Sequence, residues 1–195
     1  MCMDMAETPS TRILPIASHA PEFELPDAAG QIHTLDDVRG PRGLLVMFVC
    51  NHCPFVVHLA AAISTFAKEL EELGVGVVAI NSNDIVRYPA DAPEKMAEFS
   101  AQHDWQFPYL LDAEQTVAHA YAAACTPDFY LFDGELKLTY CGQFDSSRPR
   151  NNEAVTAADI REAVRRMLAG ELPLETQKPS TGCAIKWKPS NEPKM

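Results

Sequence analysis

The chain has 195 residues, of which 47% are hydrophobic and 22% charged, so it is long enough for one well-packed domain and short for two. Its formal net charge of −11 argues against a nucleic-acid partner and against anionic membranes, because both need clustered Lys and Arg. The first residues include Asp4 and Glu7 and no apolar stretch, so no signal peptide is predicted and the cytoplasm is the expected location.

The first half of the chain predicts a lead-in, a hairpin and a strand–helix–strand unit. Residues 1–19 lack hydrophobic periodicity, and residues 23–33 hold two short apolar segments around a turn. Residues 44–49 are a continuous apolar run, which is typical of a strand buried on both faces. Apolar residues three and four apart then predict an amphipathic helix that begins at Pro54, and residues 75–80 predict the next strand. This order implies a right-handed parallel crossover.

The second half predicts helices around a further strand, then a hairpin and a last helix. In chain order these are a helix at 93–102, a strand at 107–111, a short helix at 114–121, a hairpin at 129–140 and a helix from 156 to 168. Asp133-Gly134 fits a primed turn in the hairpin. Residues 171–195 contain four prolines and little periodicity, so they are expected to be a tail rather than a second domain. The sum is an α/β fold with a mixed sheet and helices on both faces.

The segment Cys50-Asn51-His52-Cys53-Pro54 carries the clearest chemistry. Two cysteines separated by two residues at a helix start can close a small disulfide, and the positive end of the helix favours a thiolate, which is the attacking species in disulfide exchange. A cationic His52 would stabilise that thiolate further; the alternative interpretation of His52 is a solvated loop side chain without a role. The alternative interpretations of the cysteine pair are two structural thiols or half of a zinc site. A zinc site needs four ligands and the chain has no second Cys-x-x-Cys or Cys-x-x-His, so neither metal nor cofactor is expected.

In this strand–helix context the motif resembles the thioredoxin superfamily, and its surroundings resemble the AhpC/TSA, peroxiredoxin-like branch. Residues 21–30 are similar to the N-terminal hairpin of that branch, residues 107–112 to its inserted strand, and Thr126-Pro127-Asp128-Phe129 to the superfamily's cis-proline segment. The likeness covers roughly residues 20–170. It implies a thioredoxin-like, three-layer fold with a central mixed sheet, an N-terminal β-hairpin and a strand–helix insertion.

The resemblance also implies roles for individual residues. Cys50 would be the exposed nucleophile and Cys53 the resolving thiol, with Pro127 in a cis peptide bond that faces them. Thr126, Pro127 and Pro54 would help to bind substrate, because in this superfamily the backbone before the cis-proline is free to pair with an incoming substrate strand. The implied function is a thiol–disulfide oxidoreductase that acts on protein or small thiol and disulfide substrates, has a reductase partner and contributes to cell redox homeostasis.

The resemblance to the AhpC/TSA branch also leaves an alternative function open, a thiol-dependent antioxidant peroxidase, but departures from the peroxiredoxin pattern argue against it. Peroxiredoxins place a Pro seven residues and a Thr or Ser three residues before the peroxidatic cysteine, which aligns here with Cys53. Val46 and Cys50 stand at those positions, and the peroxidase arginine would fall at about Pro127. Thioredoxin's buried Asp, six residues before the first cysteine, is replaced by Leu44. In thioredoxin this Asp is the proton acceptor for the second thiol, and here Asp84 or a water is the candidate for that role.

The remaining cysteines and one histidine allow further hypotheses. Cys125 and Cys183 are possible auxiliary redox thiols; the alternative readings are a small buried side chain for the first and an idle thiol for the second. Cys2 falls in the lead-in, and Cys141 is expected to be structural. Because soft thiolates select Cu(I), a second alternative function is a copper carrier, whose ligands would be Cys50, Cys53, His52 and His58.

Overall fold

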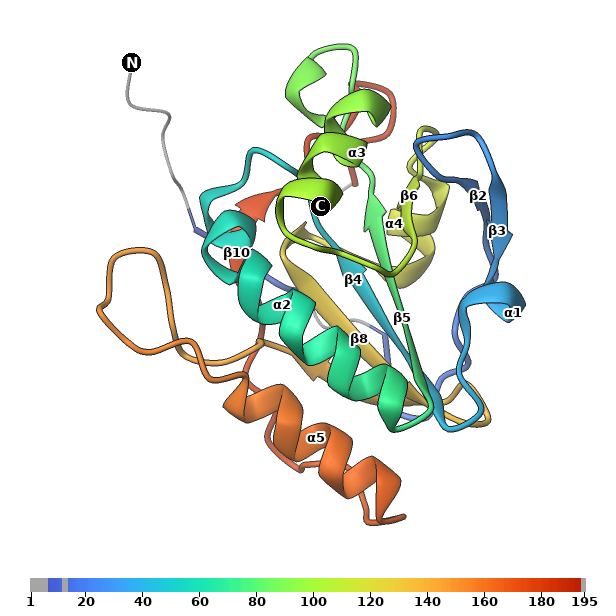
Figure 1. The fold of residues 1–195 in the computed structure, drawn as a ribbon, viewed down its shortest axis with the longest axis vertical. Coiled ribbons are helices and arrows are strands. Elements are labelled where there is room, and N and C mark those ends of the chain that lie inside the picture. Colours follow the sequence, from blue (N-terminus) through green and yellow to red (C-terminus); the bar gives the residue numbers. More distant parts are fainter. Residues whose placement is uncertain (1–6, 12–13, 194–195) are drawn as a thin grey trace.

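The computed structural model describes residues 7–11 and 14–193, so Cys2 and the first part of the expected lead-in lie outside the described residues (Figure 1). The strands are β1 (Thr8–Pro9), β2 (Glu24–Pro26), β3 (Ile32–Thr34), β4 (Gly43–Phe48), β5 (Val75–Asn81), β6 (Tyr109–Leu111), β7 (Cys125–Thr126), β8 (Asp128–Asp133), β9 (Leu138–Gly142) and β10 (Thr181–Ala184). The helices are α1 (Leu35–Val38), α2 (Pro54–Glu72), the 3-10 helix η1 (Pro89–Asp91), α3 (Pro93–Gln102), α4 (Thr116–Tyr121) and α5 (Ala158–Leu168).

The central sheet has the strand order β6-β5-β4-β8-β9 and is mixed, as the sequence predicts. β4 pairs with β8 and β8 with β9 in antiparallel fashion, whereas β5 and β6 are parallel. β5 lies beside β4, where the Val49 N–H donates to the Ile80 carbonyl at 2.9 Å. The expected N-terminal hairpin is β2–β3, and the expected strand–helix insertion corresponds to α3 and β6.

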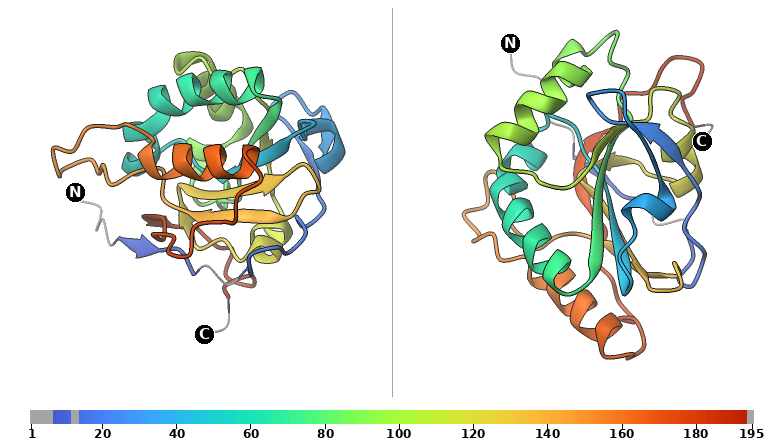
Figure 2. Two further views of the ribbon diagram at one scale, coloured as in Figure 1. Left: turned by 90° about the horizontal axis from the view of Figure 1, so that it is seen from below. Right: turned by 45° about the vertical axis from the view of Figure 1, so that its right-hand side comes forward.

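Helices cover both faces of this sheet, which makes the expected three layers. Every residue of β4 is buried, and its side chains alternate between two cores because successive residues of a strand point to opposite faces. Leu45 and Met47 belong to a core shared with α2, α3 and α5. Leu44 and Val46 belong to a core shared with α1 and α4. Figure 2 shows α2 and α5 running along the same face of the sheet, and the ion pair between Arg161 of α5 and Glu69 of α2 joins them.

The hairpin β8–β9 is confirmed, but the primed turn predicted at Asp133-Gly134 is wrong. A primed turn needs positive φ at its first central residue, and in the described chain neither of these two residues has it. The positive φ, 59°, falls instead on Leu136, whose N–H donates to the Asp133 carbonyl at 2.9 Å. The Asp133 side chain accepts hydrogen bonds from the N–H groups of Glu135 and Lys137, both at 2.9 Å, and this bonding favours the longer loop.

The segment 171–195, for which the sequence predicts a tail, contains the strand β10. This strand lies between β1 and β7 and is antiparallel to both. Gly182 is required for the pairing, because any Cβ at this position would overlap the carbonyl group of Thr126. Periodicity could not reveal β10, since a four-residue strand with a glycine and few apolar side chains carries no clear pattern.

None of the described helices combines the length and the apolar character that crossing a membrane requires.

Candidate active site

The motif lies where β4 ends and α2 begins, as the sequence predicts. Cys53 is the N-cap residue of α2, with φ −72° and ψ 119°, and Pro54 occupies the first helical turn, where proline costs nothing because that N–H has no helical partner. Both cysteines are free thiols, and they are 1% and 0% exposed. The expectation that Cys50 is exposed is therefore wrong. Its sulfur is covered because the Thr126 side chain packs on it and η1 closes over the motif loop.

The peptide bond between Thr126 and Pro127 is cis, as expected, and Thr126 contacts both sulfurs of the motif. Cys50 Sγ lies 3.5 Å from the Thr126 hydroxyl oxygen, and Cys53 Sγ lies 3.1 Å from the Thr126 carbonyl oxygen. The superfamily arrangement, in which the cis-proline segment faces the cysteine pair, is thus present here.

The backbone edge before the cis-proline is occupied, contrary to the expectation that it is free for a substrate strand. β10 pairs with β7 in the register Cys183↔Thr126 and Ala184↔Cys125. Because register partners point to the same face, this register places the Cys183 side chain beside Thr126, which contacts both sulfurs of the motif, and Cys183 lowers the pKa of Cys53. Of the five cysteines that the structure describes, Cys183 alone is not fully buried.

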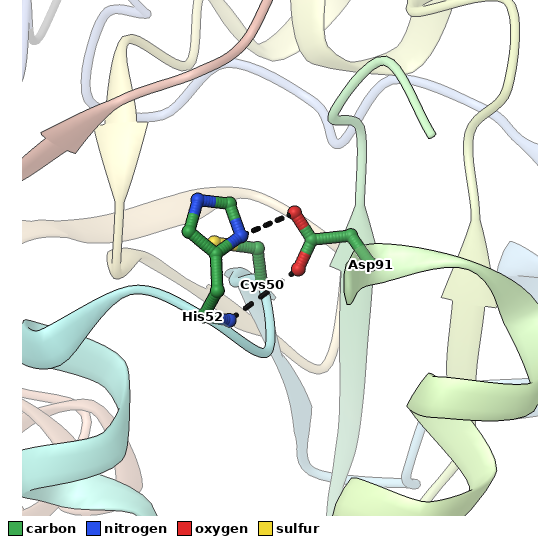
Figure 3. A group of neighbouring side chains, drawn as sticks. All are labelled: Cys50, His52 and Asp91. Carbon is green, nitrogen blue, oxygen red and sulfur yellow. Dashed lines mark hydrogen bonds and ion pairs between the residues drawn. The ribbon is translucent and has the colours of Figure 1, made fainter. Parts of the chain in front are cut away.

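His52 is held by a buried aspartate that sequence reasoning did not identify (Figure 3). His52 Nδ1 forms an ion pair with Asp91 Oδ2 at 2.7 Å, and the imidazole ring stacks on Tyr88 with the ring centroids 5.9 Å apart. Asp91 Oδ1 accepts from the backbone N–H groups of Asn51 at 2.8 Å and His52 at 3.4 Å, and Oδ2 accepts from Asn83 Nδ2 at 2.9 Å. The hydrogen bond with Asp91 raises the pKa of His52 although burial opposes this, so the imidazolium form is favoured.

The three clustered thiols hold their protons unequally, and the interaction with Cys53, then burial, raise the pKa of Cys183 above its ordinary value. Hydrogen bonds from Cys183 and then Cys50 lower the pKa of Cys53 well below its ordinary value, and burial opposes this. The hydrogen bond with Cys53, then burial, then the charge of Asp91, raise the pKa of Cys50. The Thr126 carbonyl opposes the lowering of the Cys53 pKa, because it accepts a hydrogen bond only from protonated Cys53. These shifts favour the thiolate of Cys53, at the positive end of α2, over the thiolate of the expected nucleophile Cys50.

Three other residues named from the sequence lie away from the sulfur contacts. Cys125 is buried, its Sγ lies 3.7 Å from the Pro127 carbonyl oxygen, and burial raises its pKa well above the ordinary value. His58 Nε2 is 3.2 Å from Ser147 Oγ rather than beside the thiols. The Asp84 carboxylate accepts from the backbone N–H groups of its own turn, at residues 86 and 87.

The described residues contain a group of three donors that a metal could use, Cys50, His52 and Asp91, whose ligand atoms lie within 4.8 Å of one another. His58 is not part of it. Both oxygens of Asp91 already accept hydrogen bonds from protein N–H groups, so the carboxylate fixes the loop and is not free for a cation. The donor set for copper that the sequence suggests is therefore not assembled.

Sequence reasoning missed Asp91 and β10 because nothing local marks them. Asp91 lies in the three-residue helix η1, in a stretch without periodicity, and its role depends on contacts with a loop distant in the chain. Asn51 offered a partial signal, because a polar residue inside the motif needs partners. Its side chain donates to the Ala90 carbonyl at 3.0 Å and accepts from the Tyr109 hydroxyl at 3.0 Å.

Comparison with solved structures places the fold. A conserved protein of uncharacterised function from Geobacillus kaustophilus is 46% identical, with a TM-score of 0.91 over 96% of this chain and 99% of that one. A candidate thiol:disulfide interchange protein DsbE of Chlorobium tepidum is 19% identical, with a TM-score of 0.62 over 80% of this chain and 99% of that one. The thioredoxin domain of a thiol-disulfide oxidoreductase from Bacteroides vulgatus is 18% identical, with a TM-score of 0.56 over 66% of this chain and 88% of that one, and both share the thioredoxin-like fold.

Comparison with curated sequences places the family. A candidate peroxiredoxin of Mycobacterium tuberculosis is 31% identical over 116 residues, which are 60% of this chain and 68% of that protein. The thiol-disulfide oxidoreductase ResA of Geobacillus kaustophilus is 29% identical over 129 residues, which are 65% of this chain and 70% of ResA. The model of the AhpC/TSA family matches residues 16–141, more than half of the chain. The chain therefore belongs to the AhpC/TSA family.

Proposed function

We propose that the protein is a thiol–disulfide oxidoreductase in which Cys50 and Cys53 alternate between two thiols and a mutual disulfide. The observation that carries this proposal is the contact of both sulfurs with Thr126 of the cis-proline segment, at the start of α2. Relatives whose names state the same activity, such as ResA, support it.

The proposed reaction begins with a proton transfer inside the pair. Cys50 passes its proton to Cys53, the neighbouring thiol that also contacts Thr126, and attacks one sulfur of the substrate disulfide. The substrate S–S bond breaks, a mixed disulfide forms on Cys50, and the first substrate thiol leaves. Cys53 then attacks the Cys50 sulfur and releases the second thiol. Two electrons pass from the pair to the substrate together with the one proton that the pair holds, and solvent supplies the proton for the other leaving thiolate, so the products are a Cys50–Cys53 disulfide and two substrate thiols.

His52 has an electrostatic role in this proposal. Its ion pair with Asp91 favours the charged imidazolium, and the negative charge of Cys53 acts in the same direction on the pKa of His52. A cation beside the pair stabilises each thiolate formed during exchange. The substrates we propose are proteins or small molecules that carry thiols or disulfides, and the further roles expected from the sequence, as a cytoplasmic antioxidant with a reductase partner, remain predictions.

The test is thiol mapping by mass spectrometry after equilibration in graded glutathione redox buffers, together with reductase activity on a small disulfide. We expect Cys50 and Cys53 to interconvert between dithiol and mutual disulfide, and Cys50→Ser to abolish turnover. Cys141→Ala, which removes a buried thiol in β9, is the matched control and should retain activity. Undiminished activity of Cys50→Ser would refute the proposal.

A peroxidase is the second candidate, and one contact favours it. The Thr126 hydroxyl lies 3.5 Å from Cys50 Sγ, so a hydroxyl is present near the sulfur although counting along the sequence finds none. A peroxidase also needs an arginine beside the sulfur. Arg148 instead donates hydrogen bonds to Gln143 Oε1 at 2.6 Å and to the Asp145 carbonyl at 2.8 Å. Hydrogen peroxide consumption with a thiol reductant, with sulfenic acid trapped on Cys50, would support this candidate. A lack of turnover with several reductants would exclude it.

A further inference from the structure

Three thiols, rather than two, meet at the cis-proline segment. Two neighbouring thiols, Cys183 and then Cys50, lower the pKa of Cys53. The third thiol arrives on β10, whose residue Cys183 is the register partner of Thr126. Thr126 also contacts the sulfurs of Cys50 and Cys53, so all three cysteines converge on one residue.

The position of Cys183 is built into the fold. Gly182 allows β10 to lie directly against the Thr126 carbonyl group. Just before the strand, Ser180 Oγ donates to the Gly142 carbonyl at 2.8 Å. Just after it, Ile185 is 3% exposed and its N–H donates to the Ala124 carbonyl at 3.1 Å. With both ends anchored, β10 holds Cys183 beside Cys53.

Solvent exposure separates the three thiols. Cys50 and Cys53 are 1% and 0% exposed, whereas Cys183 is partly exposed. A thiol in solution that reduces a disulfide must reach one of its sulfurs, because exchange proceeds by direct attack through a mixed disulfide. In this structure both sulfurs of the pair are covered, so an external thiol or disulfide reaches them only after the covering segments move, whereas a disulfide that includes Cys183 offers a sulfur without that movement.

We propose that Cys183 is a third redox thiol, which transfers the disulfide from the buried Cys50–Cys53 pair to a Cys53–Cys183 pair that external thiols reach. The Cys183 sulfur attacks Cys53 in the Cys50–Cys53 disulfide. The bond between Cys50 and Cys53 breaks, a bond between Cys53 and Cys183 forms, and the proton lost by Cys183 is taken up by Cys50. This step changes no oxidation level, because one disulfide and one thiol are present before and after it.

Reduction by an external low-molecular-weight thiol completes the cycle. The thiol attacks the Cys183 sulfur, the Cys53–Cys183 bond breaks, and Cys53 leaves as a thiolate. A second molecule of the thiol then attacks the mixed disulfide and releases the oxidised small molecule and the Cys183 thiol. The Cys50 thiol, protonated again in the preceding step, is the second cause that lowers the pKa of Cys53, and it supports this direction since a thiol of lower pKa leaves faster. The inference rests on the proposed function, because it needs the Cys50–Cys53 disulfide as its starting state.

The first experiment maps disulfides in the Cys50→Ser variant. After equilibration with mixtures of reduced and oxidised glutathione, the protein is quenched with acid, alkylated, digested and analysed by mass spectrometry. We expect a Cys53–Cys183 disulfide to accumulate, because Cys53 has lost its other partner. Absence of this cross-link at every glutathione ratio would overturn the inference.

The second experiment measures how fast reduced glutathione reduces the oxidised protein. We expect Cys183→Ala to slow the reaction by about tenfold or more, because the buried pair is then the only target. The matched control is Cys183→Ala with Ala184→Cys, which keeps the number of thiols but moves one of them to the opposite face of β10. The control should be as slow as Cys183→Ala.

The outcomes distinguish the two proposals. If Cys183→Ala forms the Cys50–Cys53 disulfide and is reduced at the wild-type rate, the inference fails and the proposed function stands. If wild-type protein forms no Cys50–Cys53 disulfide, the proposed function fails and the inference fails with it. Cys183→Ser, which keeps a small polar side chain, checks that a slow rate reflects the missing thiol and not altered packing: it should be as slow as Cys183→Ala.

Discussion

Replacing Asp91 by Asn should loosen the motif loop and lower the pKa of His52. Asp91 is fully buried, and its two oxygens accept from Asn51 N–H and Asn83 Nδ2 while the carboxylate pairs with His52 Nδ1. Asn keeps one acceptor oxygen and brings an NH2 group in place of the other. If the oxygen stays with the backbone N–H groups of the loop, the new NH2 faces Asn83 Nδ2, donor against donor.

The expected loss of stability follows from that contact. Asn83 cannot turn its amide to relieve it, because Asn83 Oδ1 already accepts from the Lys186 N–H at 2.8 Å. One buried donor is left unsatisfied, which lowers the free energy of unfolding by about 1–3 kcal/mol. The carboxylate charge is also lost, so the pKa of His52 falls, and the pKa of Cys50 falls because the charge of Asp91 helps to raise it.

The pH dependence has a definite sign. The pKa of His52 is raised in the folded protein, so the stability it contributes is fully present below the ordinary value of 6.5 and is lost as the pH rises through the raised pKa. The cost of Asp91→Asn should therefore be larger at low pH than at high pH.

Urea denaturation at several pH values and NMR titration of the His52 ring measure both effects. Asp84→Asn is the matched control, because Asp84 is also buried but accepts with a single oxygen, from the N–H groups of Val86 and Arg87, which an Asn oxygen can replace. An unchanged His52 pKa in Asp91→Asn would refute the reasoning, as would an equal pKa change in Asp84→Asn.

Three further predictions concern the surroundings of the thiols. Gly182→Ala should push β10 away from Thr126, lower the free energy of unfolding by about 1–3 kcal/mol, and speed alkylation of Cys53 by iodoacetamide; unchanged alkylation would contradict the assigned position of β10. Thr126→Val keeps the shape but removes a hydroxyl that lowers the pKa of both Cys50 and Cys53, so both pKa values should rise in titrations of thiolate ultraviolet absorbance, and no rise would show that the hydroxyl is idle. Burial raises the pKa of Asp128 to about 6 from an ordinary 3.8, so the folded state binds the proton more tightly and this group costs stability as the pH rises through that window. Asp128→Asn should therefore stabilise the protein relative to wild type by about 2 kcal/mol more at pH 7 than at pH 4, as measured by urea denaturation, and a pH-independent difference would argue against a buried carboxyl.

Local patterns predicted the central layers of the fold well. The apolar run at 44–49 became β4, and the three- and four-residue spacing after Pro54 became α2, because a strand buried on two faces and a helix buried on one leave different periods in the sequence. The cysteine pair was found for the same reason, since its spacing and its place before a helix are both local.

Contacts between distant segments could not be predicted in this way. Asp91 matters only because the fold brings η1 onto the motif loop, and β10 matters only because a glycine lets it approach Thr126. The burial of Cys50 under Thr126 and η1 is another such contact, whereas the resemblance to the superfamily implied an exposed thiol.

The pairing of β10 with β7 also affects association between molecules. An unpaired strand edge presents N–H and carbonyl groups to which any extended polypeptide can add, including another copy of the same chain. In this protein the edge before the cis-proline is already satisfied by an internal strand. The hydrogen bonds that bring Cys183 to Cys53 therefore also protect this edge from aggregation, and they favour disulfide substrates that do not require strand addition.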